Sequence, residues 1–501
     1  MNPIANLELE TASHPEALTR TVIEPITRVE GHGKVTLLMD EQNHVKQARL
    51  HIVEFRGFEK FIQGRPYWEA PVMVQRLCGI CPVSHHLAAA KAIDMFVGAR
   101  QLTPTAEKLR RLMHCGQTLQ SHALHFFHLA SPDLLFGFGA DVATRNIIGV
   151  IQAHPALAVQ GVKLRKYGQE VIRVLAGKRV HGILAIPGGV NKTLSREDRE
   201  YLLKDIDQMV TWSQDAVGIV GKLFTDNQTE FERFGSFRSN FLSLTTSKGD
   251  FELYDGGLRA RDDKGQDIFD HVNYAHYLRY LHEEVKSWSY MKFPFIVSLG
   301  NDEGWYRVGP LARINNARSM GTPLAEEARK AFMALGKGEP IHATLAYHWA
   351  RMIEMLYAAE AIRDLLQDPD ILGTDLMTQG ERATEGVGVI EAPRGTLIHH
   401  YKIDEHDAIV KANLIVATTH NNTAMNAAVR EVAAHYLDGK VLTEGLLNHI
   451  EVAIRAYDPC LSCATQALGR MPLHVELWDA EGQLVDRLVK GADGTLSDEL
   501  G

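Results

Sequence analysis

Two short cysteine motifs at opposite ends of the 501-residue chain constrain its fold more than any other feature. RLCGICPVSHH at 76–86 carries Cys78 and Cys81, and DPCLSC at 458–463 carries Cys460 and Cys463. A CxxC turn presents two thiolates to one ion, and two such turns supply the four sulfurs of a zinc or iron–sulfur site. Spacing alone leaves two interpretations open: two separate structural turns, or one composite site that brings both chain ends together.

The composition is that of a globular protein and narrows the possible partners. Five cysteines are too few for a disulfide scaffold, and CxxC pairs in a reducing compartment favour metal or redox chemistry. The formal net charge of −9 gives no electrostatic reason to expect nucleic acid. No apolar run reaches the roughly 18 residues of a bilayer span, and the N-terminus lacks the apolar stretch of a secretory signal. We therefore expect a cytoplasmic protein with no direct membrane span.

Local patterns predict an α+β fold that is predominantly α-helical, with a central bundle of long helices. After the first CxxC, helical spacing continues to Gly98, a C-cap candidate. Thr103 and Pro104 predict the start of a long helix. A second long helix is expected at 343–367, ended by Asp368-Pro369.

Small antiparallel β elements are expected near both ends. Alternation over 34–55 predicts a hairpin that turns at Glu41-Gln42-Asn43, and 386–419 alternates again. Two helices, around 423–437 and 444–456, lead into DPCLSC. The region from about 225 to 340 gives mixed signals and is left unassigned.

The residues around the cysteines resemble those of nickel–iron hydrogenase large subunits. RLCGICPVSHH is similar to the family's N-terminal metal motif, and DPCLSC to its C-terminal partner. Four further signatures occur in the family's order: TRVEGHGKV at 27–35, FRGFE at 55–59, EAPRGTL at 391–397 and LIVATTHN at 414–421. The resemblance covers nearly the whole chain, is greatest to the cytoplasmic, bidirectional NAD-linked branch, and favours the single composite site.

The resemblance implies a nickel–iron centre whose iron carries carbon monoxide and cyanide. By position, Cys78 and Cys460 would be terminal nickel ligands, while Cys81 and Cys463 would bridge nickel and iron. Soft thiolates suit these metals and must be deprotonated to bind them. The implied reaction is the reversible heterolytic cleavage of H2.

The resemblance also gives roles to residues around the metals. The Cys460 thiolate would accept a proton and pass it to Glu30, which requires Glu30 to lie close to Cys460. Taken alone, Glu30 would more simply cap a turn or pair with Arg28. Arg394 would donate a hydrogen bond to one cyanide and is an alternative proton acceptor, and Thr418 would donate to the second cyanide. His85 would donate a hydrogen bond to a bridging thiolate. Pro393 and Asp458 would lie above the nickel, in a group of residues where Ser121 replaces an aspartate of many relatives.

A magnesium site and a removable extension are implied near the C-terminus. Glu59 would bind Mg2+ with the backbone carbonyl of Leu414. Gln466 stands where the family has a histidine ligand, and its amide oxygen can replace that ligand. We expect a catalytic domain over 1–466 and an extension over 467–501, including a hairpin in HVELWDAEGQLVDRL, that is removed during maturation.

The expected partners follow from what the sequence lacks. With no cysteines for clusters of its own, the chain must pass electrons to a small iron–sulfur subunit, and the NAD-linked branch adds a flavin-containing diaphorase. No GxGxxG motif in a βαβ context indicates a nucleotide site. A maturation protease and metal-insertion chaperones are also expected. The alternatives are an H2-sensing regulatory hydrogenase chain, which usually lacks the extension, a quinone-module relative, which typically lacks the cysteines, and a structural zinc protein.

Overall fold

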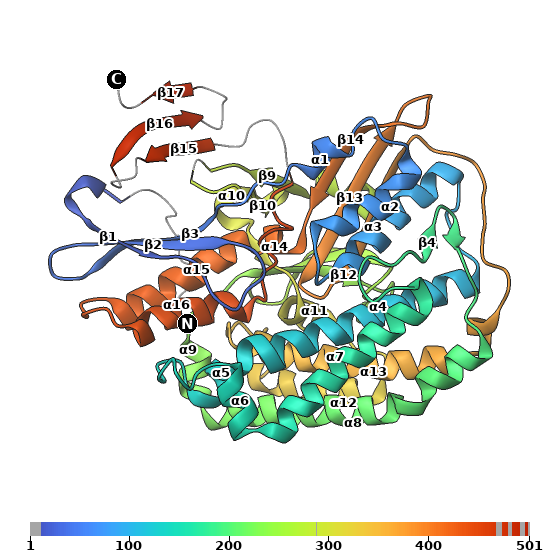
Figure 1. Cartoon of the computed structure of the whole chain (residues 1–501), viewed down its shortest axis with the longest axis horizontal. Coiled ribbons are helices and arrows are strands. Elements are labelled where there is room, and N and C mark those ends of the chain that lie inside the picture. Colours follow the sequence, from blue (N-terminus) through green and yellow to red (C-terminus); the bar gives the residue numbers. More distant parts are fainter. Residues whose placement is uncertain (1–11, 287, 467–472, 479–482, 491–495, 499–501) are drawn as a thin grey trace.

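The computed structural model describes residues 12–286, 288–466, 473–478, 483–490 and 496–498. Long helices form the lower part of the molecule in Figure 1, and the larger sheets lie above them. The predicted fold class, predominantly helical with small antiparallel sheets, is confirmed. The prediction for HVELWDAEGQLVDRL falls partly outside the described residues; the described parts include the antiparallel strands β15 (Leu473–Trp478) and β16 (Leu484–Lys490).

The helical part is built around one central helix, α13 (Ala346–Gln367). Most of its side chains are buried, as expected of a helix that other elements surround. The helices that pack around it or beside one another are α4 (Pro104–Leu124), α7 (Pro155–Ala176), α8 (Arg196–Asp226) and α12 (Pro323–Met333). The Thr103 hydroxyl accepts the Ala106 N–H at 3.2 Å, and α13 ends at Gln367 with Asp368 as its C-cap, so the predicted start of α4 and the predicted end of α13 are confirmed.

The N-terminal sheet contains the predicted hairpin and one additional strand. Strands β2 (Gly33–Met39) and β3 (Val45–Ile52) pair antiparallel, and β1 (Thr19–Ile23) pairs with the free edge of β2. Asn43 in the turn has a positive φ of 63°. α15 (Asn422–Val432) packs on β3 and on α16 (Glu444–Ala456). The chain that leads to the second cysteine motif therefore lies beside the N-terminal sheet.

The C-terminal sheet supports the helix that follows the first cysteine motif. Strands β12 (Glu385–Ala392), β13 (Gly395–Ile403) and β14 (Ile409–Ile415) are antiparallel, as predicted. Helix α3 (Pro82–Asp94) lies on β12 and β13 with every side chain buried. A Cβ on Gly388 would lie 2.1 Å from the Ala88 carbonyl oxygen, so only glycine permits this close approach.

A third sheet occupies the region left unassigned, so placing sheets only near the ends was incomplete. Its strand order is β11-β6-β7-β8, with β11 parallel to β6 and the other pairs antiparallel. Its strands are β6 (Asn240–Thr245), β7 (Gly257–Arg261), β8 (Asp267–Val272) and β11 (Tyr306–Arg307). Every residue of β6 is buried, and a strand buried on both faces shows no alternation.

The remaining elements are short. They are α1 (Phe58–Phe61), α2 (Ala70–Met73), α5 (Ser131–Phe136), α6 (Ile147–Ala153), α9 (Gln228–Arg233), α10 (Gly300–Glu303), α11 (Pro310–Asn316), α14 (Ala417–His420), β4 (Ala185–Ile186), β5 (Gly189–Val190), β9 (Leu281–Glu284), β10 (Phe293–Ile296) and β17 (Leu496–Asp498). Turns of 3-10 helix include η3 (Val74–Leu77) and η4 (Met95–Val97), and Gly98 caps η4 with a φ of 73°.

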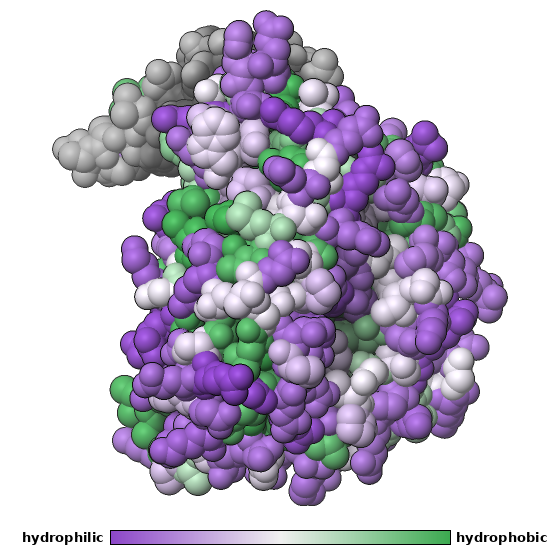
Figure 2. Space-filling view, turned by 90° about the vertical axis from the view of Figure 1, so that its right-hand side faces the viewer, coloured by the Kyte–Doolittle hydropathy of each residue, from purple (hydrophilic) through white to green (hydrophobic). Residues whose placement is uncertain are grey.

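The outer surface is mixed in polarity. The face in Figure 2 shows hydrophobic residues as patches between hydrophilic ones, as on most globular proteins. Among the described helices, none is by itself long and apolar enough to cross a bilayer. Only α6 and α7 taken together pass that test, and a bend of 120° separates them.

Candidate metal centre

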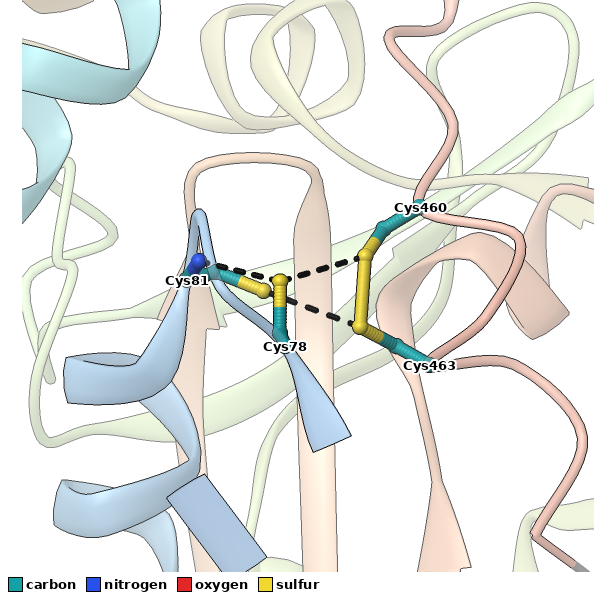
Figure 3. A group of neighbouring side chains, drawn as sticks. All are labelled: Cys78, Cys81, Cys460 and Cys463. Atoms are coloured by element: carbon teal, nitrogen blue, oxygen red, sulfur yellow. Dashed lines mark hydrogen bonds between the residues drawn. A yellow bond between two sulfur atoms is a disulfide. The ribbon is translucent and has the colours of Figure 1, made fainter. Parts of the chain in front are cut away.

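The fold brings the two cysteine motifs together in one buried cluster (Figure 3). The four sulfur atoms lie within 4.8 Å of one another. The Cys78 and Cys460 sulfurs are 3.3 Å apart, and those of Cys81 and Cys463 are 3.9 Å apart. Sulfurs bound tetrahedrally at about 2.3 Å from one ion lie about 3.8 Å from each other. The cluster thus has the dimensions of a four-thiolate metal site, and two separate structural turns are excluded.

Two of these sulfurs are bonded to each other in the structure. Cys460 and Cys463 form a disulfide, while Cys78 and Cys81 are free thiols (Figure 3). Metal ligation by all four requires thiolates, so the metal-loaded form needs Cys460 and Cys463 in the reduced state.

The first motif lies between a 3-10 turn and the start of α3. Cys78 follows η3, and Cys81 is the N-cap of α3. The backbone N–H groups of Ile80 and Cys81 donate to the Cys78 sulfur at 3.2 and 3.0 Å. Burial opposes ionisation, but hydrogen bonding from Cys81 and the charge of Arg394 lower the pKa of Cys78. The N-terminus of α3 adds partial positive charge beside the sulfurs.

The second motif pairs with the RVEGH segment. Glu30 and Cys460 form an isolated β-bridge, in which the Leu461 N–H donates to the Glu30 carbonyl at 2.9 Å. Gly31 allows this contact: its φ is 82°, and an added Cβ would lie 2.6 Å from the Ser462 nitrogen.

The carboxylate of Glu30 lies directly beside the Cys460 sulfur. Its Oε2 is 3.0 Å from Sγ and also accepts the Ser462 N–H, while the Ser462 hydroxyl donates to Oε1. Arg28 forms a bidentate ion pair with Asp133 at 2.7 and 2.8 Å, so the alternative pairing of Arg28 with Glu30 is wrong. The proximity that proton transfer from Cys460 requires is therefore present.

Arg394 is buried over the cluster and held by Asp458. Its Nε donates to the Asp458 carbonyl at 2.5 Å and its Nη2 to the Asp458 carboxylate at 2.9 Å, while Nη1 has a weaker contact with Ser121 at 3.4 Å. Burial opposes its charge, but Asp458 and the two free cysteines raise the pKa of Arg394. Burial also raises the pKa of Asp458, against the effect of Arg394. The arginine is thus a fixed positive group beside the sulfurs.

A small pocket adjoins the Cys81 and Cys460 side of the cluster. The Thr418 hydroxyl oxygen, which lines this pocket, accepts the Cys460 N–H at 2.9 Å. The hydroxyl hydrogen of Thr418 remains available to donate. The full lining is Cys81, Ser84, His85, Ala392, Pro393, Arg394, Leu397, Val416, Ala417, Thr418 and Cys460. Mostly apolar walls with a few polar groups suit small ligands of an iron atom.

His85 lies at this pocket and is the end of a buried hydrogen-bond chain. Its Nδ1 is 3.1 Å from Nε2 of His399, whose Nδ1 is 2.6 Å from the Tyr401 hydroxyl. Burial lowers the pKa of His85 to about 3, so the ring is neutral. If Tyr401 donates to His399 and His399 donates to His85, Nε2 of His85 carries the hydrogen. Among the described residues no hydrogen bond joins His85 to a cysteine sulfur, so that role stays a prediction.

The three predicted magnesium ligands also lie together. The Glu59 carboxylate accepts the Leu414 N–H at 2.7 Å, and the Glu59 N–H donates to the Gln466 carbonyl at 3.3 Å. The Gln466 amide oxygen accepts the Phe58 N–H at 3.3 Å. All three are buried. Carboxylate, carbonyl and amide oxygens match the ligand preference of Mg2+.

An ion-pair network beneath Arg394 was not predicted from the sequence. Arg313 on α11 donates from Nε and Nη2 to the carboxylate of Glu354 in α13, each at 2.6 Å, and from Nη1 to the carboxylate of Glu391 in β12 at 2.8 Å. It also donates to the carbonyls of Ala392 and Pro393, the two residues before Arg394. Ser462 was also missed, although it lies inside the DPCLSC motif.

Comparisons with known proteins agree with this geometry. A family model described as "HoxL-like" matches residues 20–55, and one described as "Nickel-dependent hydrogenase" matches residues 56–140 and 248–466. The chain is 49% identical to the beta chain of the NAD-reducing hydrogenase HoxS of Cupriavidus necator, over 93% of this chain and 99% of that one. It is 41% identical to a chain of the F420-non-reducing hydrogenase of Methanothermobacter thermautotrophicus, over 94% and 100% of the two chains.

Solved hydrogenase structures have the same fold as this chain. A crystal structure of an NAD+-reducing [NiFe]-hydrogenase in the H2-reduced state superposes with a TM-score of 0.88 at 55% identity, covering 91% of this chain and 100% of that chain. The Ni-Fe-Se hydrogenase from D. vulgaris Hildenborough in the reduced state superposes with a TM-score of 0.72 at 25% identity, covering 89% and 100%.

Proposed function

Since this chain belongs to the nickel-dependent hydrogenase family, we propose that its four cysteines hold a nickel–iron centre with carbon monoxide and cyanide on iron. The protein is the catalytic subunit of a hydrogenase, an oxidoreductase that interconverts H2 with protons and electrons. One observation carries the proposal for the site: four buried sulfurs from both chain ends lie within 4.8 Å of one another.

The residues present fit this metal centre. Four soft sulfur ligands suit nickel and low-spin iron, and the residues that line the pocket beside Cys81 and Cys460 include hydrogen-bond donors for small iron ligands. Such a centre, when bound, would supply a Lewis acid that polarises H2 and makes it acidic enough to lose a proton.

The proton route that we propose begins at the Cys460 sulfur. The reduced Cys460 thiolate accepts a proton and passes it over 3.0 Å to Oε2 of Glu30. The Ser462 hydroxyl and N–H hold the Glu30 carboxylate in place, so the acceptor oxygen does not have to reorganise. Glu30 is only partly buried, which allows it to pass the proton outward.

Arg394 acts in this proposal by charge and position. Because Nε and Nη2 are bound to Asp458, the guanidinium is held in one orientation. Its N–H groups can donate charge-assisted hydrogen bonds to a cyanide nitrogen. Because its pKa is raised, Arg394 stays protonated and is a poor proton acceptor. Cys460 is therefore the better candidate for the base.

Electrons leave through partner proteins. Beyond the four ligands the chain has only Cys115, buried in α4, so it has no set of thiols for an iron–sulfur cluster of its own. We propose that a small iron–sulfur subunit takes the electrons directly and that a flavin-containing diaphorase beyond it reduces NAD. The similarity to NAD-reducing hydrogenases supports this assembly. A cytoplasmic location is part of the same proposal.

A hydrated Mg2+ near the C-terminus and proteolytic maturation complete the proposal. Glu59, the Leu414 carbonyl and the Gln466 amide oxygen would bind Mg2+, with waters as the other ligands. Metal-insertion chaperones would load the centre, and a protease would then cut after Gln466; the nickel-dependent hydrogenase match ends at that residue. Intact-mass measurement of active protein should show a chain that ends at 466, and a full-length active chain would rule the cleavage out.

Infrared spectroscopy of the purified complex, combined with metal analysis, tests the proposed centre. Carbon monoxide and cyanide on iron absorb in a region where proteins have no bands. We expect such bands together with nickel and iron in the preparation. Zinc without nickel, and no bands in that region, would instead indicate a structural four-cysteine site.

A further inference from the structure

Ser84 has a buried hydroxyl that forms no hydrogen bond with any described residue. The residue lies in the first turn of α3, is fully buried, and lines the pocket beside Cys81 and Cys460. Its Oγ has no hydrogen-bond partner in the part of the chain that the structure describes. A buried hydroxyl without a partner is unfavourable and requires an explanation; for Ser84, which lines the pocket, a ligand in that pocket supplies the missing acceptor.

The usual local acceptor for this hydroxyl is already taken. A serine in a helix can donate to the carbonyl four residues earlier, which for Ser84 is that of Ile80. The Ile80 carbonyl accepts the side-chain amides of Gln117 and Gln120, each at 2.8 Å. A carbonyl oxygen has two lone pairs, and the hydrogen bonds from Gln117 and Gln120 of α4 occupy both, so this oxygen cannot also accept from the Ser84 hydroxyl. The packing of α4 against α3 thus keeps the hydroxyl free.

The position of Ser84 on α3 directs it toward the metal side. Ser84 follows Cys81 by three residues, and residues three apart lie on the same face of a helix. The pocket that both residues line also contains Thr418 and Arg394, the two predicted cyanide donors. Its other walls are mostly apolar, so an iron ligand in the pocket meets few donors besides these three.

We propose that Ser84 donates a third hydrogen bond to the cyanide ligands of the iron. This inference rests on the proposed nickel–iron centre and adds a donor from the first cysteine motif to Arg394 in the turn between β12 and β13 and Thr418 in α14. An anionic cyanide nitrogen is a strong acceptor, which makes the hydrogen bond charge-assisted. This hydrogen bond draws electron density from the nitrogen lone pair and strengthens the C–N bond of cyanide. Loss of the hydrogen bond therefore moves the cyanide stretching band to lower wavenumber.

Infrared spectra of the assembled complex with Ser84→Ala and Ser84→Thr test the proposal. We expect Ser84→Ala to move one cyanide band to lower wavenumber and to leave the other cyanide band nearly unchanged. Ser84→Thr keeps a hydroxyl on the same carbon and should restore the wild-type band. The matched control is Ser213→Ala in α8, because Ser213 is also fully buried with an unpartnered hydroxyl but does not line the pocket.

The possible outcomes are distinct. Wild-type bands in Ser84→Ala, or an equal shift in Ser213→Ala, would overturn the role of Ser84 while the proposed centre stands. A wild-type complex without any such band would overturn the centre itself, and the inference with it. If Ser84→Ala fails to retain nickel and iron, wild-type bands in Ser84→Thr support the hydroxyl, and loss of the centre in both variants overturns it.

Discussion

At the scale of single residues, the site depends on contacts between positions that are hundreds of residues apart in sequence. Glu30 lies 3.0 Å from the Cys460 sulfur, and the Leu461 N–H is bonded to the Glu30 carbonyl. No local pattern indicates that RVEGH would meet DPCLSC; only the resemblance predicted it. The elements on either side, in contrast, follow from local signals such as the Thr103 cap and the alternation in 34–55.

Glu30→Gln should separate metal binding from proton transfer. Glutamine has the same side-chain shape as glutamate and can accept the hydrogen bond from the Ser462 hydroxyl, but it cannot take a proton from Cys460. We expect nickel and iron contents near wild type and H2 oxidation by the complex reduced by about 10²–10⁴-fold. Glu54→Gln is the control, because Glu54 contacts His32 on the surface and none of the four sulfurs. Activity of Glu30→Gln equal to that of the control would contradict the proposed route.

At the scale of elements, the close packing of α3 on β12 sets the position of the first cysteine motif. Gly388→Ala would place a Cβ 2.1 Å from the Ala88 carbonyl and force the helix away from the strand. We expect a loss of about 1–3 kcal/mol in the free energy of unfolding, measured by denaturant titration.

Gly218→Ala in α8 is the opposite case. Nothing lies within 4 Å of an added Cβ there, and alanine is the better helix former. This variant should be more stable by about 0.5–1 kcal/mol. Equal effects of the two substitutions would show that α3 and β12 are not packed as described.

The Arg313 network joins α11, α13 and β12 beneath the site, and the sequence did not predict it. Its partners Glu354 and Glu391 lie in separate elements, and nothing in the local pattern distinguishes buried charges from surface ones. The sequence assigns no elements to the region from about 225 to 340 for a related reason: the fully buried strand β6 in this region lacks the alternation by which strands are recognised.

Arg313→Met should leave Glu354 and Glu391 buried without their cation. Removing one partner of a buried ion pair costs about 3–5 kcal/mol, which should appear as a large fall in the thermal unfolding midpoint. The control is Arg261→Met, because the Arg261–Asp267 pair is partly exposed and contributes about 1 kcal/mol or less. A fall no larger than the control's would mean that the network does not stabilise the fold.

At the scale of the whole molecule, many histidines are buried in the neutral form. His342 is one: its Nδ1 accepts from Arg307 at 3.0 Å and its Nε2 donates to the Asp263 carbonyl at 2.8 Å. Burial, with the charge of Arg307, lowers the pKa of His342 from 6.5 to about 3. The unfolded chain therefore binds more protons between these values, and stability is lost as the pH falls from 6.5 toward 3.

His342→Asn should weaken this acid sensitivity. Asparagine keeps an acceptor near the position of Nδ1 but does not titrate, so a loss of about 2 kcal/mol between pH 8 and pH 5 should disappear. The measurement is the unfolding midpoint against pH for both proteins. Parallel curves over this range would show that His342 is protonated as easily in the folded protein as in the unfolded one.

The central claim is that sulfurs from both ends of the chain bind one nickel atom. Nickel X-ray absorption of the purified complex, compared between wild type and the Cys78→Ser and Cys463→Ser variants, tests it most directly. We predict a sulfur-rich nickel environment in the wild type that both substitutions, one in each motif, alter or abolish. Nickel whose environment is changed by substitution in only one motif, or nickel without sulfur ligands, would contradict the account.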